Sequence, residues 1–180
     1  VGSEMCIRDR AYLNLRWTPH DLNVAASVTG EPGQWTRWRR IGGALQVQRG
    51  GQWEALKAVP GLPFQKNERL TGTYGHESAY TSGTLMWGAT SVWRQYYTFT
   101  PDGRFTRSAS QNLYGTMDNG ATRTTGSAGS SRPDEEGTYH VSGYTLELRY
   151  RSGRVDRTYG FFWDAKRSRL VIGGTTYSRK

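Results

Sequence analysis

The sequence predicts an all-β protein in which an antiparallel meander closes into a barrel. The first observation is alternation: Tyr144, Leu146, Leu148 and Tyr150 are separated by polar or charged residues, which is the period of a strand with one buried face. The second is composition, because Gly, Thr, Ser, Tyr and Trp are abundant between short apolar runs. The third is that no window shows a helical period.

Proline and turn residues divide the chain into a smaller β region, a linker and the barrel. Residues 11–59 are expected to form roughly three to five strands. Residues 60–67 are expected to be a linker, because the stretch Val59–Pro63 lies between the two β regions. Residues 68–180 are expected to form the barrel.

Within the barrel, turn signals separate the predicted strands. Trp93–Phe99 ends at the turn Thr100–Gly103, after which Arg104–Ser108 returns. Tyr144–Tyr150 and Arg154–Trp163 flank a Ser-Gly turn and form the clearest hairpin.

The last two strands and one long connection complete the barrel. Leu170–Ile172 and Thr175–Arg179 flank a Gly-Gly turn. Residues 109–136 are rich in Gly, Ser, Thr and Asn, which predicts a flexible loop. This loop is interpreted either as a mouth loop that touches a partner or as a tolerated surface insertion.

The N-terminal region resembles part of the barrel. Arg40–Gly51 and His140–Gly153 have matching turns and apolar positions. One hypothesis is a tandem duplication whose first copy is truncated. The other is a single body to which residues 11–59 add further strands.

Residues 1–10, VGSEMCIRDR, match the in-frame translation of a transposase adapter used to build sequencing libraries. The adapter encodes the first nine residues, and its last two bases require Ser or Arg next, where the chain has Arg10. We therefore expect this segment not to be native and the natural N-terminus to be missing, and we exclude it from the fold prediction.

The chain carries a net charge of +9. Binding to nucleic acid, acidic lipid or anionic polysaccharide is one interpretation of this charge. The arginines alternate with apolar residues and form no basic block, which favours solubility of strand faces as the reason, and no nucleic-acid partner is expected. No apolar run approaches the roughly 18 residues of a membrane-spanning helix.

No residue pattern predicts catalysis or metal binding. The only cysteine, Cys6, lies in the adapter-like segment, so a disulfide or thiol site is excluded from the remainder. His20, His76 and His140 lack the spacing of metal ligands. Asp134–Glu136 are adjacent, and consecutive strand residues point to opposite faces, so they make a poor acid–base pair. Neither an enzyme nor a cofactor is expected.

Aromatic residues are the better indication of a binding site. The chain has seven Trp and eleven Tyr, and a barrel lined with such residues can hold a flat or apolar ligand. The candidate ligand residues are Tyr97, Tyr139, Tyr159 and Trp163. The alternative is that these side chains simply fill a small core.

Residues 70–180 open with Leu70–Tyr74, which contains the motif Gly-Thr-Tyr, and close with a basic residue, Arg179, near the last strand. These features resemble the small lipocalin-like (calycin) β-barrel modules of bacterial proteins. Calycin barrels start with Gly-x-Trp, where this chain has Tyr74 in place of Trp, and they place a basic residue over that first aromatic residue. The resemblance implies that Gly72, Tyr74 and Arg179 close the barrel, that the first and last strands are neighbours, and that Arg179 covers the Tyr74 ring.

Two classes of function follow. The first is a non-enzymatic binding module, for a small hydrophobic ligand in the barrel or a partner at its mouth. The second is a structural or interaction domain of an envelope protein, with a solid core and no ligand. An interior void of roughly 300 Å3 or more favours the first, and aromatic side chains that meet across the barrel axis favour the second. A periplasmic, envelope or secreted location is favoured, and no oligomeric state is predicted.

Overall fold

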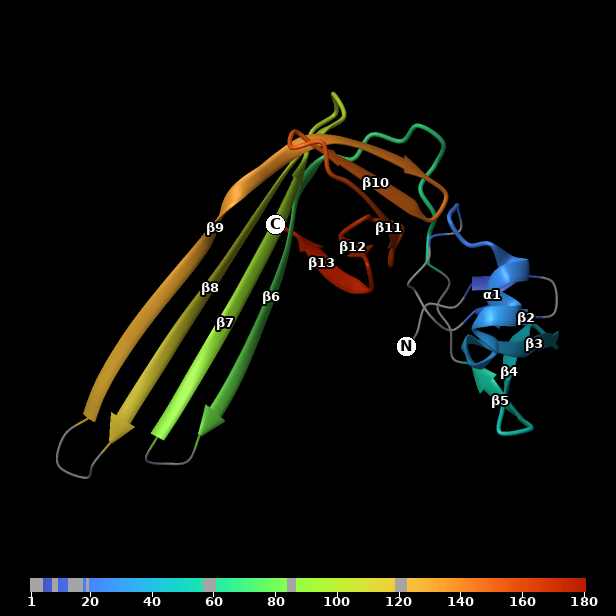
Figure 1. Cartoon of the computed structure of the whole chain (residues 1–180), viewed down its shortest axis with the longest axis horizontal. Helices are drawn as coiled ribbons and strands as arrows, with labels where there is room; N and C mark the ends of the chain where they lie inside the picture. The colour runs from blue at the N-terminus through green and yellow to red at the C-terminus, as the bar shows by residue number, and fades with distance from the viewer. Residues whose placement is uncertain are drawn as a thin grey trace. The chain divides into compact units, whose positions relative to one another are not determined.

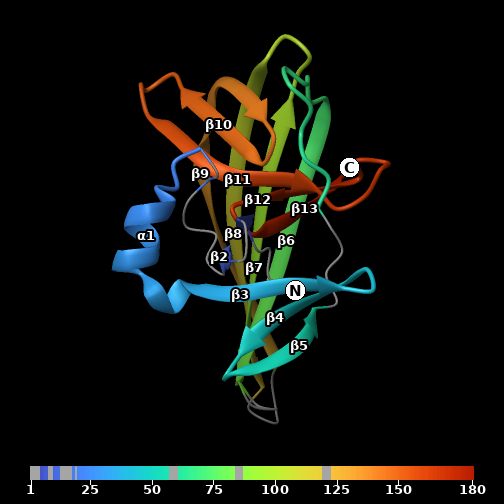
Figure 2. The same cartoon turned by 90° about the vertical axis from the view of Figure 1, so that its right-hand side faces the viewer.

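The computed structural model describes residues 5–7, 10–12, 18, 20–56, 61–83, 87–118 and 123–180. These residues form the predicted all-β fold, with a short N-terminal sheet and a closed eight-stranded antiparallel barrel (Figures 1 and 2). No helix in the described ranges is long and apolar enough to cross a membrane.

The described elements comprise thirteen strands, one α-helix and one 3-10 helix. Their bounds are β1 Met5–Ile7, β2 Arg10–Tyr12, α1 Val24–Gly30, η1 Pro32–Gln34, β3 Trp35–Ile41, β4 Ala44–Arg49, β5 Gln52–Leu56, β6 Gly72–Gly83, β7 Trp87–Phe99, β8 Arg104–Asp118, β9 Arg123–Ser142, β10 Thr145–Tyr150, β11 Val155–Phe162, β12 Arg169–Ile172 and β13 Thr175–Arg179.

The N-terminal sheet is an antiparallel series in the order β1-β2-β3-β4-β5. The hairpin from β3 to β4 turns at Gly42 and Gly43, whose φ angles are 56° and 82°. Both central residues of such a two-residue turn need a positive φ, which favours glycine. The adapter-like residues Met5–Ile7 form the edge strand of this sheet, paired with Arg10–Tyr12.

The short helix α1 was not expected from the sequence. It has seven residues, about two turns, which is too short to display a helical period. Its start is set by capping chemistry, since the Asn23 side chain accepts a hydrogen bond from the Ala26 N–H at 3.1 Å. The indole of the buried Trp35 donates to the hydroxyl of Ser27 at 3.1 Å, which attaches the helix to β3.

The barrel closes as the sequence predicts, in the order β10-β11-β12-β13-β6-β7-β8-β9. Arg179 pairs with Tyr74 and Ser178 with Gly75, so the first and last strands are neighbours. Tyr74 is buried, at 2% exposure. Gly72 leaves room for Arg179, because a Cβ at Gly72 would lie 3.1 Å from the Arg179 Nε. Stacking of Arg179 on the Tyr74 ring stays a prediction.

Residues 109–136 differ from the sequence prediction. The described residues of this stretch are strand, in β8 and β9, and not a loop. The two strands pair along their length, with Ser110 opposite Ser131 and Leu113 opposite Ala128. Ser and Thr suit strands with both faces in water, and β7 supplies main-chain partners to β8, so a low apolar content does not prevent strand formation.

The long strands β6, β7, β8 and β9 lie side by side as one sheet (Figure 1). β6 pairs with β7 without interruption from Gly72, opposite Phe99, to Gly83, opposite Gly88. With 12 to 20 residues each, these strands are longer than the other barrel strands, which have four to eight.

Main-chain contacts join the predicted linker to other strands. The Leu62 N–H donates to the Phe162 carbonyl at 2.8 Å, and the Phe64 N–H donates to the Gly143 carbonyl at 2.7 Å. Phe64 is 3% exposed, and its ring packs edge-on against Phe162 at 5.6 Å. Residues 57–60 lie outside the described residues.

Contacts divide the chain into two compact units that do not follow sequence order. The first unit comprises Val1–Glu68, His140–Glu147 and Asp156–Thr176, and the second comprises Arg69–Tyr139, Leu148–Val155 and Tyr177–Lys180.

Candidate functional site

Aromatic rings fill the barrel core in the second unit. The ring pairs Phe99–Tyr139, Tyr97–Tyr177 and Phe105–Tyr150 meet edge-to-face, with centroids 5.0, 5.3 and 5.2 Å apart. Each pair joins strands that are separated by one strand in the barrel order. The rings therefore pack against one another along the inner face of the barrel, in the geometry that aromatic pairs prefer.

The hydroxyl of Tyr139, a candidate ligand residue, is engaged by backbone groups. It accepts a hydrogen bond from the Leu70 N–H at 2.7 Å. Its single proton is shared between the carbonyl oxygens of Leu70, at 3.0 Å, and Thr100, at 3.2 Å. Burial raises the pKa of Tyr139 above its ordinary value. Tyr139 thus attaches the start of the barrel to the turn after β7.

Tyr159 and Trp163 lie in the first unit, in a hydrophobic cluster around Phe161. Both rings pack on Phe161, at 5.7 and 5.2 Å. Alternation along β11 places Gly160 on the opposite face of this strand, where a Cβ would lie 3.3 Å from the Leu146 side chain.

Each unit contains two of the four candidate ligand residues. Tyr97 and Tyr139 both contact Phe99, and Tyr159 and Trp163 both contact Phe161. Their role as ligand residues stays a prediction.

A polar network that the sequence analysis did not identify lies beside the aromatic core. With the Gln95 amide oriented to satisfy its neighbours, its oxygen accepts from the Arg107 Nε at 2.6 Å and from Nη2 at 2.7 Å. Its nitrogen donates to the Tyr177 hydroxyl at 2.8 Å. Burial raises the pKa of Tyr177 to about 12. Arg107 lies two residues after Phe105 in the same strand, and this spacing could have indicated that its side chain shares the inward face of Phe105.

Glu135 completes the network between two arginines. It accepts from the Arg107 Nη1 at 2.8 Å and from the Arg154 Nη1 at 3.2 Å. Partial burial raises the pKa of Glu135, but the hydrogen bonds from Arg154 and Arg107 outweigh this effect, so its pKa lies below the ordinary value. The network neutralises the inward-facing charge of Arg107 and is structural in character.

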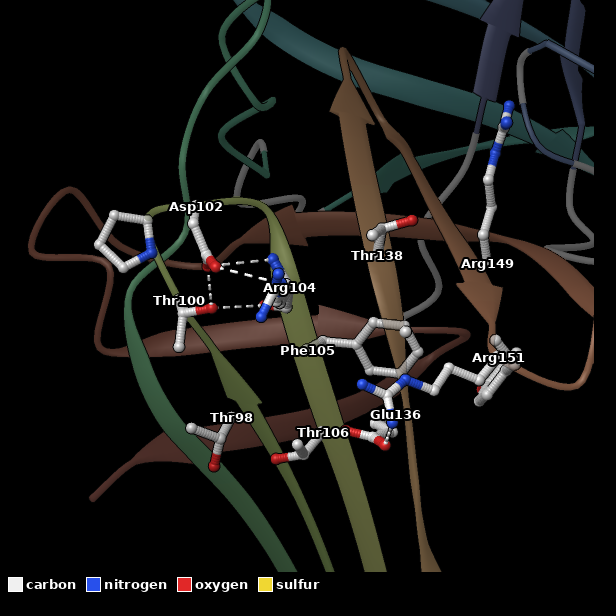
Figure 3. A pocket seen from close by; sticks show the side chains of 13 residues that line it. Thr98, Thr100, Asp102, Arg104, Phe105, Thr106, Glu136, Thr138, Arg149 and Arg151 are labelled. Carbon is white, nitrogen blue, oxygen red and sulfur yellow. Dashed lines mark hydrogen bonds and ion pairs between the residues drawn. The ribbon is translucent and has the colours of Figure 1, made fainter.

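The described residues outline a groove of about 910 Å3 beside the turn after β7 (Figure 3). Thr98, Thr106 and Thr138 line it from three adjacent strands. Gly137 also lines it. Only glycine fits at this position, because a Cβ there would collide with the carbonyl oxygen of Arg149. We call this hollow the threonine groove.

Charged residues at the threonine groove form ion pairs. Asp102 accepts a hydrogen bond from the Thr100 hydroxyl, which lowers the pKa of Asp102, and its carboxylate lies 3.3 Å from the Arg104 Nε. Glu136 forms an ion pair with Arg151. The groove thus presents threonine hydroxyls beside two ion pairs.

The histidines do not assemble a metal site within the described part of the chain, where no three His, Cys, Asp or Glu side chains are placed to hold an ion. His20 and His140 are exposed. The His76 ring packs against Tyr177, with centroids 5.7 Å apart.

Comparison of the chain with protein-family models, curated proteins and solved structures gave no match. The fold therefore carries the functional argument. A closed antiparallel barrel of eight strands is typical of binding proteins rather than of enzymes.

Proposed function

We propose that this chain is a non-enzymatic interaction module whose barrel is a solid scaffold and whose partner binds on the outside. One observation carries the proposal: aromatic rings from β7, β8, β9, β10 and β13 pack edge-to-face on one another inside the barrel. The hydroxyl of Tyr139 supports it, since bonds to Leu70 and Thr100 leave it no proton with which to orient a ligand.

Native mass spectrometry of the purified chain tests the solid core. The expected result is the mass of the chain alone, and a stoichiometric small-molecule adduct would overturn the proposal in favour of an interior ligand. Phe99→Ala is the matched control, because it opens an apolar void that should take up benzene. This variant shows that the measurement detects interior binding.

The threonine groove is the outer surface that we propose for the partner. The net charge of +9 on the chain favours a partner segment with acidic side chains. Titration with tetraglutamate should shift the amide resonances of Thr98, Thr106 and Thr138, whereas tetralysine should leave them unchanged. Thr138→Glu places a carboxylate in the groove and should remove the shifts of Thr98 and Thr106. Equal shifts with both peptides would exclude an acidic partner at this groove.

We also infer a relationship of residues 70–180 to lipocalin-like (calycin) domains. The eight-stranded antiparallel order and the pairing of Tyr74 with Arg179 support this relationship. The adapter origin of residues 1–10 stays a prediction, and the genomic sequence upstream of the codon for Ala11 tests it.

A further inference from the structure

One edge of the long β6–β9 sheet extends past its neighbouring strand. β13 pairs with β6 in the register that joins Ser178 to Gly75. Continued, this register brings Thr175, the first residue of β13, no further than Ser78. Ala79–Gly83 therefore runs beyond β13, while its other side pairs with β7. We call Ala79–Gly83 the open edge, and none of the described strands pairs with it on the outer side.

Alternation shows which backbone groups face outward along the open edge. The carbonyl of Thr73 accepts a hydrogen bond from the Lys180 N–H at 2.9 Å, on the side of β6 away from β7. The register of β6 with β7 is unbroken, so every second residue after Thr73 directs its N–H and C=O to that same side. The outward groups are those of Ala79, Thr81 and Gly83.

The open edge lacks the features that protect strand edges in other proteins. Exposed edges are usually blocked by proline, by charged side chains or by bulges. On the opposite side of the four long strands, β9 contains both charge and proline, in the run Arg132, Pro133 and Asp134. The open edge has the sequence Ala-Tyr-Thr-Ser-Gly, with no charge and no proline.

An exposed aromatic side chain lies on the open edge. Tyr80 is 72% exposed. It pairs with Ser91, which pairs in turn with Leu113, so Tyr80 and the half-exposed Leu113 lie on the same face of the sheet. A residue on an added strand directly opposite Tyr80 would have its Cβ about 5 Å from that of Tyr80. An apolar side chain there would cover the ring.

The charge near the start of the open edge favours an acidic partner. Glu77 lies 3.1 Å from the Lys180 Nζ and 3.5 Å from the Arg94 Nε. Two cations thus share one carboxylate, and the chain as a whole carries +9. The same net charge opposes close approach of a second copy.

We propose that the open edge binds an extended polypeptide segment of a partner by strand addition, with an apolar side chain against Tyr80 and a carboxylate near Lys180. Main-chain hydrogen bonds from Ala79, Thr81 and Gly83 supply the attachment, and the contacts at Tyr80 and Lys180 supply selectivity. The proposal extends the proposed function, since it adds a second outer docking surface to that of the threonine groove.

Hydrogen exchange of single amides tests the proposal. The probe is a capped seven-residue peptide of alternating Thr and Val with a central Phe and an Asp at each end. At saturation, exchange at Ala79, Thr81 and Gly83 should slow by about tenfold or more, while Tyr80 and Ser82, which bond to β7, should change little. Unchanged exchange at the three outward amides would overturn the proposal.

A matched pair of variants separates strand addition from general contact. Ala79→Pro removes one outward N–H and leaves the pairing of β6 with β7 intact, so the protection of Thr81 and Gly83 should be lost. Ala79→Thr keeps the N–H and should retain the protection. N-methylation of the peptide residues that face β6 gives the same test without altering the protein. Protection that survives N-methylation would overturn the proposal.

Three further outcomes test the occupant of the open edge, the charge of the partner and the proposed function. Slowing of the same amides with rising protein concentration, in the absence of peptide, would assign the edge to a second copy and overturn the partner proposal. Equal protection by a peptide with Lys in place of both Asp residues would overturn the acidic requirement. An interior ligand found by native mass spectrometry would overturn the proposed function and leave these amide measurements unaffected.

Discussion

Arg107 follows Phe105 by two residues on β8, so alternation places its guanidinium on the inner face of the barrel. It is accommodated there because the Gln95 oxygen and the Glu135 carboxylate accept its donors. An inward-facing charge is tolerated when it is paired and hydrogen-bonded. Sequence alternation could locate Arg107, but its partners come from β7 and β9 and could not be read locally.

Replacement of Tyr139 by Phe should lower the free energy of unfolding by about 1–3 kcal/mol, because it leaves the buried N–H of Leu70 without its acceptor. Urea denaturation measures the change. Tyr114→Phe is the control, since Tyr114 is 42% exposed and should lose less than about 0.5 kcal/mol. Equal losses in the two variants would contradict a structural role for the Tyr139 hydroxyl.

Tyr177 should make stability fall at alkaline pH. Its pKa rises from 10.0 to about 12 through burial. A raised folded-state pKa contributes stability below pH 10 that is lost as pH rises toward 12, by roughly 3 kcal/mol in total. Unfolding measured from pH 9 to 12 should show a steeper loss for the native chain than for Tyr177→Phe. Parallel curves for the two proteins would refute the shift.

At the scale of elements, turns were predictable and strand partners were not. The turns after Phe99, Tyr150 and Ile172 lie where Gly and Pro-Asp-Gly signals place them, because turn chemistry is local. Residues 109–136 contain few apolar residues, yet they form strands through pairing between β7, β8 and β9. Arg157 interrupts the apolar pattern of β11 because it pairs with the buried Glu147, at 2.6 Å, and with Asp21.

Gly137 and Gly115 offer a matched test of strand packing. A Cβ at Gly137 would collide with the backbone carbonyl of Arg149, whereas a Cβ at Gly115 would meet no atom within 4 Å. Gly137→Ala should therefore destabilise the chain by about 1–3 kcal/mol. Gly115→Ala should be neutral or stabilising by up to about 1 kcal/mol, because it reduces the freedom of the unfolded chain. The midpoint temperature of thermal unfolding, measured for both variants, tests this difference, and equal midpoints would contradict it.

At the scale of the whole molecule, the segment between the N-terminal sheet and β6 takes part in the core. Phe64→Ala should cost about 3–5 kcal/mol, since Phe64 is 3% exposed and packs on Phe162. Leu62→Ala, at a position 38% exposed, should cost much less. Urea denaturation of both variants tests this, and a negligible effect of Phe64→Ala would indicate a plain linker at residues 60–67.

The sequence by itself determined the all-β class, the main hairpin turns and the pairing of the Tyr74 strand with the Arg179 strand. Each of these rests on alternation, on turn chemistry or on the similarity to calycin barrels, and all three can be read along the chain. Tertiary structure decided that the aromatic rings pack on one another inside the barrel, that Tyr159 and Trp163 pack on Phe161, and that none of the described strands pairs with the outer side of Ala79–Gly83. These features depend on register between strands far apart in sequence, and a shift of one residue moves every side chain to the opposite face.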